Sequence, residues 1–136
     1  MIPKRFKEIP IRLLSKCPDN DNKFNLCAVS YSGTSVVSYA FNARVTEAAV
    51  EQYAKCIHCM YDGKENDWFS YNRHAEVSVI KKSQGIITTV SVVRLTKNGD
   101  LALAKPCNVC VAYLRDNGVS QIVYSVNNNS FKKIKL

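Results

Sequence analysis

The sequence lacks any apolar run close to the ~18 residues that a membrane-spanning helix needs. Its first seven residues are not followed by the apolar stretch of a signal peptide. We therefore expect a soluble, cytoplasmic protein with no membrane partner. Glycine and proline are also few, with five and four residues scattered along the chain, which excludes disordered and low-complexity classes. The 136 residues contain no repeat and no linker, and they predict a single domain over 1–136.

Acidic residues are in deficit. Eleven Asp and Glu face nineteen Lys and Arg, so the net charge is +8, which favours a polyanionic or phosphorylated partner. Much of the excess lies near the two ends, and residues 127–136 are interpreted as a basic tail. Such a charge run is either a solvated surface or a contact for nucleic acid. The terminal cations are Lys4, Arg5, Lys7, Lys132, Lys133 and Lys135.

Hydrophobic patterning predicts strands that alternate with helices after an opening hairpin. Gly33 marks the turn of that hairpin, Pro106 precedes a helix and Gly118 ends it. This pattern indicates a three-layer α/β domain with a mixed sheet of about five strands, and the helices at 74 and 107 can begin side by side. The predicted helices cover 5–16, 46–60, 74–83 and 107–116, and the predicted strands cover 24–31, 35–41, 86–95 and 120–126; residues 61–72 are predicted to be irregular.

Two motifs carry the chemistry. His74-Ala75-Glu76 and Pro106-Cys107-Asn108-Val109-Cys110 together match H-x-E…P-C-x-x-C, the signature of zinc-dependent nucleobase deaminases. An imidazole and two thiolates, from His74, Cys107 and Cys110, can occupy three corners of a zinc tetrahedron and leave the fourth open. The start of a helix favours thiolates because its dipole is positive there. Glu76 is then the acid/base that moves protons from the attacking water to the ring nitrogen and the leaving amine.

With these motifs, residues 24–126 resemble the cytidine and deoxycytidylate deaminase superfamily. The resemblance implies a cytidine-deaminase-like fold, one catalytic Zn(2+) per chain and a homo-oligomer. Phe41-Asn42 is similar to the family's strand-ending Gly-Tyr-Asn, which implies that Asn42 contacts the sugar of the substrate. It also implies that the Ala75 N–H holds the base carbonyl and that Tyr124 lines the base pocket. Tyr124 can equally be a core aromatic.

The form of the motif narrows the substrate class. His as the first ligand is typical of deoxycytidylate, tRNA adenosine and polynucleotide cytosine deaminases. The Lys105-Pro106-Cys107 sequence looks most like small microbial or viral enzymes of the deoxycytidylate type, so a nucleotide is the expected substrate. Single-stranded DNA or tRNA stays open as the substrate, as does a catalytically silent zinc fold. Trp68, Phe69 and Tyr71 can stack on a base or anchor a loop to the core.

Four further cysteines precede the signature. Cys56 and Cys59 lie one turn apart on a predicted helix, and with Cys17 or Cys27 they can form a second, structural zinc site. The resemblance allows this, because some deoxycytidylate deaminases are similar in having an extra zinc in this region. The alternative is a set of buried thiols, which is ordinary for a cysteine such as Cys27 within a strand.

Overall fold

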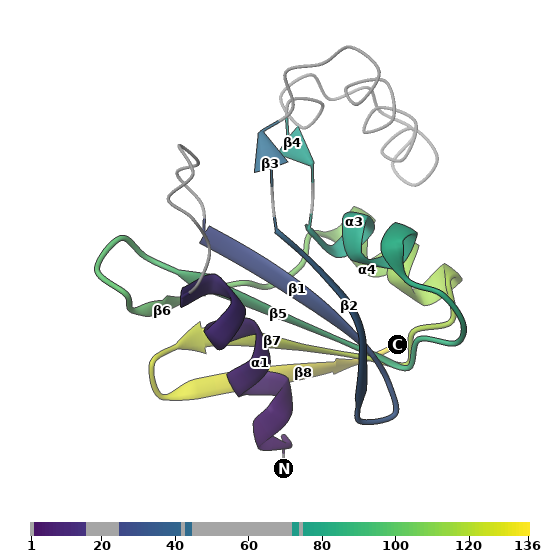
Figure 1. Cartoon of the computed structure of the whole chain (residues 1–136), viewed down its shortest axis with the longest axis horizontal. Helices are drawn as coiled ribbons and strands as arrows, with labels where there is room; N and C mark the ends of the chain where they lie inside the picture. The colour runs from purple at the N-terminus through teal and green to yellow at the C-terminus, as the bar shows by residue number, and fades with distance from the viewer. Residues whose placement is uncertain (1, 16–24, 42, 45–71, 74) are drawn as a thin grey trace.

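The structure is a computed structural model that describes residues 2–15, 25–41, 43–44, 72–73 and 75–136 (Figure 1). Its main sheet has the strand order β2-β1-β5-β7-β8, and the short strand β6 pairs with the last two residues of β5. Strands β5 and β7 are parallel, while every other pair in this sheet is antiparallel. The strands are β1 (Asn25–Ser32), β2 (Ser35–Phe41), β5 (Thr89–Leu95), β6 (Leu101–Ala102), β7 (Gln121–Asn127) and β8 (Ser130–Lys135).

Three helices belong to the described residues: α1 (Lys4–Ser15), α3 (Ala75–Lys82) and α4 (Asn108–Asp116). The predicted α/β class with a mixed sheet is therefore confirmed, although the sheet has six strands where about five were predicted. A second, two-stranded sheet consists of β3 (Ala43–Arg44) and β4 (Asn72–Arg73). The predicted helix over 46–60 lies outside the described residues, as does the predicted irregular segment over 61–72 apart from Asn72.

Helix α1 packs on one face of the main sheet, which we call the α1 face (Figure 1). Phe6 and Leu14 of this helix join a buried cluster with the inward side chains of β1, including Val29 and Tyr31. Pro10 lies inside α1 and cannot donate a backbone hydrogen bond, which weakens the sequence prediction of a helix here. The helix forms nevertheless, because burial of its apolar side, which includes Pro10, against the sheet offsets the missing hydrogen bond.

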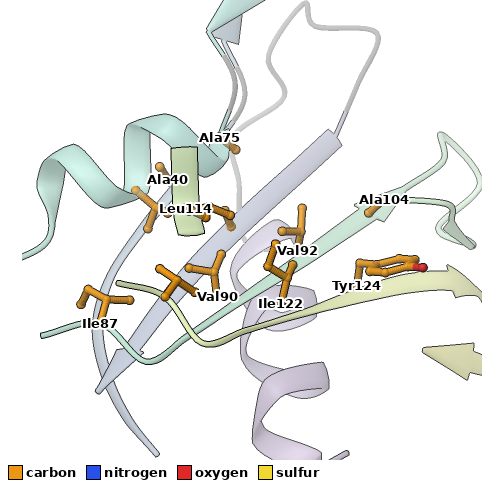
Figure 2. Close-up of a cluster of buried hydrophobic side chains, with 12 residues drawn as sticks. Ala40, Ala75, Ile87, Val90, Val92, Ala104, Leu114, Ile122 and Tyr124 are labelled. Atoms are coloured by element: carbon orange, nitrogen blue, oxygen red, sulfur yellow. The ribbon is translucent and has the colours of Figure 1, made fainter. Parts of the chain in front are cut away.

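Helices α3 and α4 pack on the opposite face, which we call the cysteine face (Figures 1 and 2). Ala75 and Val79 of α3 and Leu114 of α4 share one buried cluster with strand residues such as Val92 and Ile122. Because side chains alternate along a strand, β1 and β5 contribute to both clusters and are covered on both sides. Both strands accordingly bury apolar side chains on both faces of the sheet.

The prediction of a basic tail over residues 127–136 is wrong in one respect. Residues 130–135 form β8, which pairs antiparallel with β7 after a turn at Asn128 and Asn129. Phe131 packs into the cluster on the α1 face, while Ile134 packs on the cysteine face. The alternation is hard to recognise in the sequence because lysines occupy the solvent-facing positions of this edge strand. Lysines at such positions discourage pairing with another chain.

No helix among the described residues is long and apolar enough to cross a membrane.

Candidate active site

Cys107 and Cys110 lie at the start of α4. Cys107 is the N-cap residue, with extended backbone angles of φ −69° and ψ 164°, and its Sγ accepts a hydrogen bond from the Cys110 N–H at 3.4 Å. The prediction placed the helix start at Cys107 itself, one residue earlier than observed. Because the backbone N–H groups of the first turn point toward this end, the position favours negative charge on sulfur.

The segment that leads into α4 is anchored by Ser125 on β7. The Ser125 hydroxyl donates to the Ala102 carbonyl at 2.7 Å and accepts from the Arg94 N–H at 3.2 Å. The Ala104 N–H in turn donates to the Ser125 carbonyl at 2.9 Å. These three bonds tie β5, β6 and the loop after β6 to β7, and the loop then reaches Pro106, which is buried.

Glu76 approaches the cysteine pair from the first turn of α3. Its side chain is 5% exposed, although a carboxylate is costly to bury without partners. It hydrogen bonds to the Cys110 thiol, so the first turns of α3 and α4 meet as predicted. The hydrogen bond with Cys107 raises the pKa of Cys110 well above the ordinary value of a cysteine, and burial of the thiol and the charge of Glu76 raise it further.

Cysteine thiolates are ligands that suit a cation such as zinc. Cys110 and Glu76 are buried and Cys107 is partly exposed. After the hydrogen bond with Cys107 and burial, repulsion by the charge of Glu76 also raises the pKa of the Cys110 thiol. A divalent ion would relieve that repulsion and hold both sulfurs as thiolates. Among the described residues, no group of three or more His, Cys, Asp or Glu side chains is arranged to hold a metal ion. His74, the third predicted ligand, is not one of those residues.

The short sheet β3–β4 brings together the segment that follows Asn42 and the segment that precedes His74, two of the predicted site residues. Ala43, which follows Asn42 in the sequence, pairs with Arg73, which precedes His74. The chain therefore leaves β2 and returns to α3 through the paired strands β3 and β4 (Figure 1). Asn42 and His74 themselves lie outside the described residues.

Two predicted substrate contacts are buried on the cysteine face. Ala75 is the first residue of α3 and has no exposed surface, and its backbone belongs to the turn whose N–H groups have no carbonyl partner within the helix. Tyr124 is 6% exposed and packs in the cluster beneath α3 and α4. Figure 2 shows Tyr124 and Ala104 together at one end of that cluster. Packing is consistent with Tyr124 as a core aromatic, and its role in a base pocket stays a prediction.

The second zinc site also stays a prediction. Cys27 is a fully buried thiol whose Sγ lies 3.9 Å from the Ala28 carbonyl, and its side chain points into the cluster on the α1 face. It therefore lies on the other side of the sheet from Cys107 and Cys110. Outside the described residues lie Cys17, Cys56, Cys59, Trp68, Phe69 and Tyr71.

Sequence reasoning missed Ser125 as a structural anchor of the site. A serine within a run such as Ile122-Val123-Tyr124-Ser125 carries no signal of its own, since its three bonds go to residues at least 21 positions away. Only its occurrence at a buried strand position, where a hydroxyl needs partners, hints at such a role.

Comparison with known proteins provides no family assignment. No model of a known protein family matches the sequence, and no curated protein matches it significantly.

Proposed function

We propose that this protein is a zinc-dependent hydrolase that removes the exocyclic amine of a nucleobase, with cytosine in a deoxynucleotide as the leading substrate. The proposal starts from the H-x-E…P-C-x-x-C signature. The observation that supports it most is the contact between Glu76 and Cys110, which joins the two halves of the signature across α3 and α4. A chance occurrence of the two motifs would not require this contact.

Cys107 and Cys110, together with His74, are the residues that would hold zinc. When bound, the ion supplies a Lewis acid that makes a water molecule nucleophilic at neutral pH. Glu76 stands next to the cysteine pair without being needed as a ligand, which leaves its carboxylate available to carry protons.

The chain's own groups then account for the proton movements. A carboxylate oxygen of Glu76 takes a proton from the attacking water and delivers it to N3 of the cytosine ring. The same carboxyl group passes the second proton to the exocyclic amine, which leaves as ammonia while the C4 carbonyl of uracil forms. Cytosine and water are thus converted to uracil and ammonia. The N–H groups at the start of α3, including that of Ala75, can hold the base carbonyl during these steps.

A polynucleotide substrate is the second candidate. The chain has nineteen Lys and Arg against eleven Asp and Glu, which gives a net charge of +8. Such a surface attracts phosphates in series as well as a single phosphate. The leading assignment nevertheless remains the nucleotide, because of the Lys105-Pro106-Cys107 sequence.

A substrate panel tests the proposal. Cytidine, deoxycytidine, their mono- and triphosphates, single-stranded DNA and tRNA are assayed for uracil or inosine. We expect turnover to be highest with deoxycytidylate. Uracil formed mainly in DNA would move the substrate to polynucleotides, whereas zinc-loaded protein with no turnover of any substrate would leave a silent zinc fold.

A further inference from the structure

The register of β8 sorts its three lysines onto two faces of the sheet. Residues directly opposite each other in an antiparallel pair share a face. Lys133 lies opposite Val123 and Lys135 opposite Gln121, and both therefore belong to the α1 face. Lys132 lies opposite Tyr124 on the cysteine face.

Helix α1 adds cations on the same face of the sheet as these two lysines. The Lys7 Nζ lies 5.6 Å from the centre of the Phe131 ring, which fixes this lysine over β8. Lys4 is exposed three residues earlier, on the neighbouring position of the helix surface. We call this surface the α1–β8 ridge, and it consists of Lys4, Lys7, Phe131, Lys133 and Lys135.

Within the part of the chain that the structure describes, little negative charge offsets the ridge. Glu8 is the one acid on α1, and β8 has none. The other acids of the described residues lie elsewhere: Glu76 is buried at the candidate active site, Asp100 is hydrogen bonded to Asn128 in a turn, and Asp116 ends α4. The ridge therefore presents an excess of positive charge on this face, with Lys4, Lys133 and Lys135 exposed and Lys7 partly exposed.

We propose that the α1–β8 ridge binds single-stranded nucleic acid through its phosphates. Lys133 and Lys135 are two residues apart on a strand, a rise of about 6.7 Å, which is comparable with the length of one nucleotide in an extended single strand. The phosphates of such a strand can then meet successive lysines, and the condensed counterions that they release supply the binding energy.

A lipid surface fits the ridge less well. Helices that lie on membranes insert an exposed apolar face between the headgroups. The large apolar side chains of α1 are instead buried or partly buried against the sheet, with Phe6, Pro10 and Leu14 in its interior. Phe131, the apolar member of the ridge, is partly buried and lies next to Lys7, so the ridge offers mainly charge, as expected for contact with a polyelectrolyte.

This inference does not rest on the proposed enzyme activity. The ridge lies on the α1 face, whereas Cys107, Cys110 and Glu76 lie on the cysteine face. A bound strand would leave the candidate active site open, so binding can be measured separately from any chemistry.

The test is fluorescence anisotropy with a labelled single-stranded oligothymidylate, titrated at several salt concentrations. Four lysine–phosphate contacts predict a log–log slope of Kd against salt of about 3 in magnitude, at about 0.7 for each contact. The double variant Lys133→Ala with Lys135→Ala should lower that slope by about half and weaken binding. Lys105→Ala with Lys132→Ala removes the same charge away from the ridge and should leave the slope unchanged. Circular dichroism verifies that both variants are folded.

Four results would overturn the proposal. The first is that the ridge variant binds the oligonucleotide as tightly as wild type does. The second is that only the Lys105 and Lys132 variant binds more weakly, which would put the strand on the cysteine face. The third is no binding at about 50 mM salt, which would leave the lysines as protection of an edge strand. The fourth is tighter binding of polyglutamate or of anionic vesicles than of the oligonucleotide, which would assign the ridge to another class of partner.

Discussion

Glu76 combines burial, a thiol partner and a position in the first turn of a helix. A carboxylate at a helix start is stabilised by the dipole, yet this one is 5% exposed and packs against Cys110, so its charge is not solvated like that of a surface residue. Proteins retain such unfavourable arrangements mainly where chemistry needs them. The residue is therefore the most informative position for a single substitution.

We predict that Glu76→Gln lowers turnover of the best substrate by about 10²- to 10⁴-fold, because the amide keeps the shape but cannot shuttle protons. Zinc content should stay at the wild-type level, since Glu76 is not a proposed ligand. Ser78→Ala is the matched control on the same helix. The Ser78 hydroxyl is buried with no hydrogen-bond partner among the described residues, so its removal should leave turnover unchanged. Near-normal turnover by Glu76→Gln would rule out the proposed role.

We predict that the buried Tyr31 makes the fold less stable at high pH. Its side chain is fully buried, its hydroxyl lies 2.8 Å from the Ser91 Oγ, and burial raises the pKa of Tyr31 to about 12. The folded protein keeps this proton while the unfolded chain loses it above about pH 10, so the free energy of unfolding falls between pH 10 and 12. The contribution is about 2–3 kcal/mol at most.

Urea denaturation at pH 8 and pH 11.5 measures this effect. Tyr31→Phe cannot ionise, so the variant should lose less stability than wild type over the same interval. Equal losses in both proteins would show that other groups cause the alkaline destabilisation.

Ser125→Ala should destabilise the fold by about 1–3 kcal/mol, because the partly buried Arg94 N–H and Ala102 carbonyl each lose a hydrogen-bond partner. Ser15→Ala is the control, since its hydroxyl bonds the Ile11 carbonyl at an exposed position, and the change should be within about 0.5 kcal/mol. Chemical denaturation of both variants gives the comparison. A Ser125 variant as stable as the control would mean that water or backbone movement replaces both bonds.

At the scale of elements, the helices and strands with clear end signals are predictable from the sequence. Gly33 adopts φ +64° in the β1–β2 turn, a conformation that glycine tolerates best. Gly118 at φ +85° follows α4, and the Val119 N–H returns to the Leu114 carbonyl as in a helix-ending motif. The signature likewise predicts that Glu76 and the cysteine pair meet, because both helix starts must approach each other for the motif to work.

Elements whose identity depends on tertiary partners are not predictable in this way. The two residues of β6 become a strand only because Arg94 and Leu95 lie opposite them. Strand β8 has lysine at half of its six positions, a composition typical of a tail, and its strand character comes from pairing with β7. Burial of Cys27 on the α1 face, opposite the candidate site, likewise depends on which way β1 faces in the sheet.

Ending the chain after Asn127 tests whether β8 is an integral strand. Removing it exposes β7 as an edge and deletes apolar contacts of Phe131 and Ile134, so we predict a loss of at least about 3 kcal/mol in the free energy of unfolding. The full-length Lys133→Ala, Lys135→Ala variant, with charges removed but the strand kept, should stay within about 0.5 kcal/mol of wild type per substitution. A truncated protein with an unchanged melting temperature would mean that β8 contributes no stability.

At the scale of the whole molecule, the sheet separates two surfaces. One face carries the cysteine pair, Glu76 and the buried Tyr124, while the other carries α1 and its cations. Separation of this kind allows a polyanion to be held on one side without blocking a small site on the other. The cations of the α1–β8 ridge and the signature, which the sequence shows as unrelated features, thus belong to different faces of one sheet.

The central claim, a zinc centre at the starts of α3 and α4, is tested most directly by the zinc content of purified protein. Inductively coupled plasma mass spectrometry should find at least one zinc per wild-type chain and the loss of one ion in Cys107→Ala. Cys27→Ala, which removes a thiol on the opposite face, should retain that ion. Wild-type protein without zinc after refolding in its presence, or a Cys107→Ala protein with unchanged zinc content, would contradict the account.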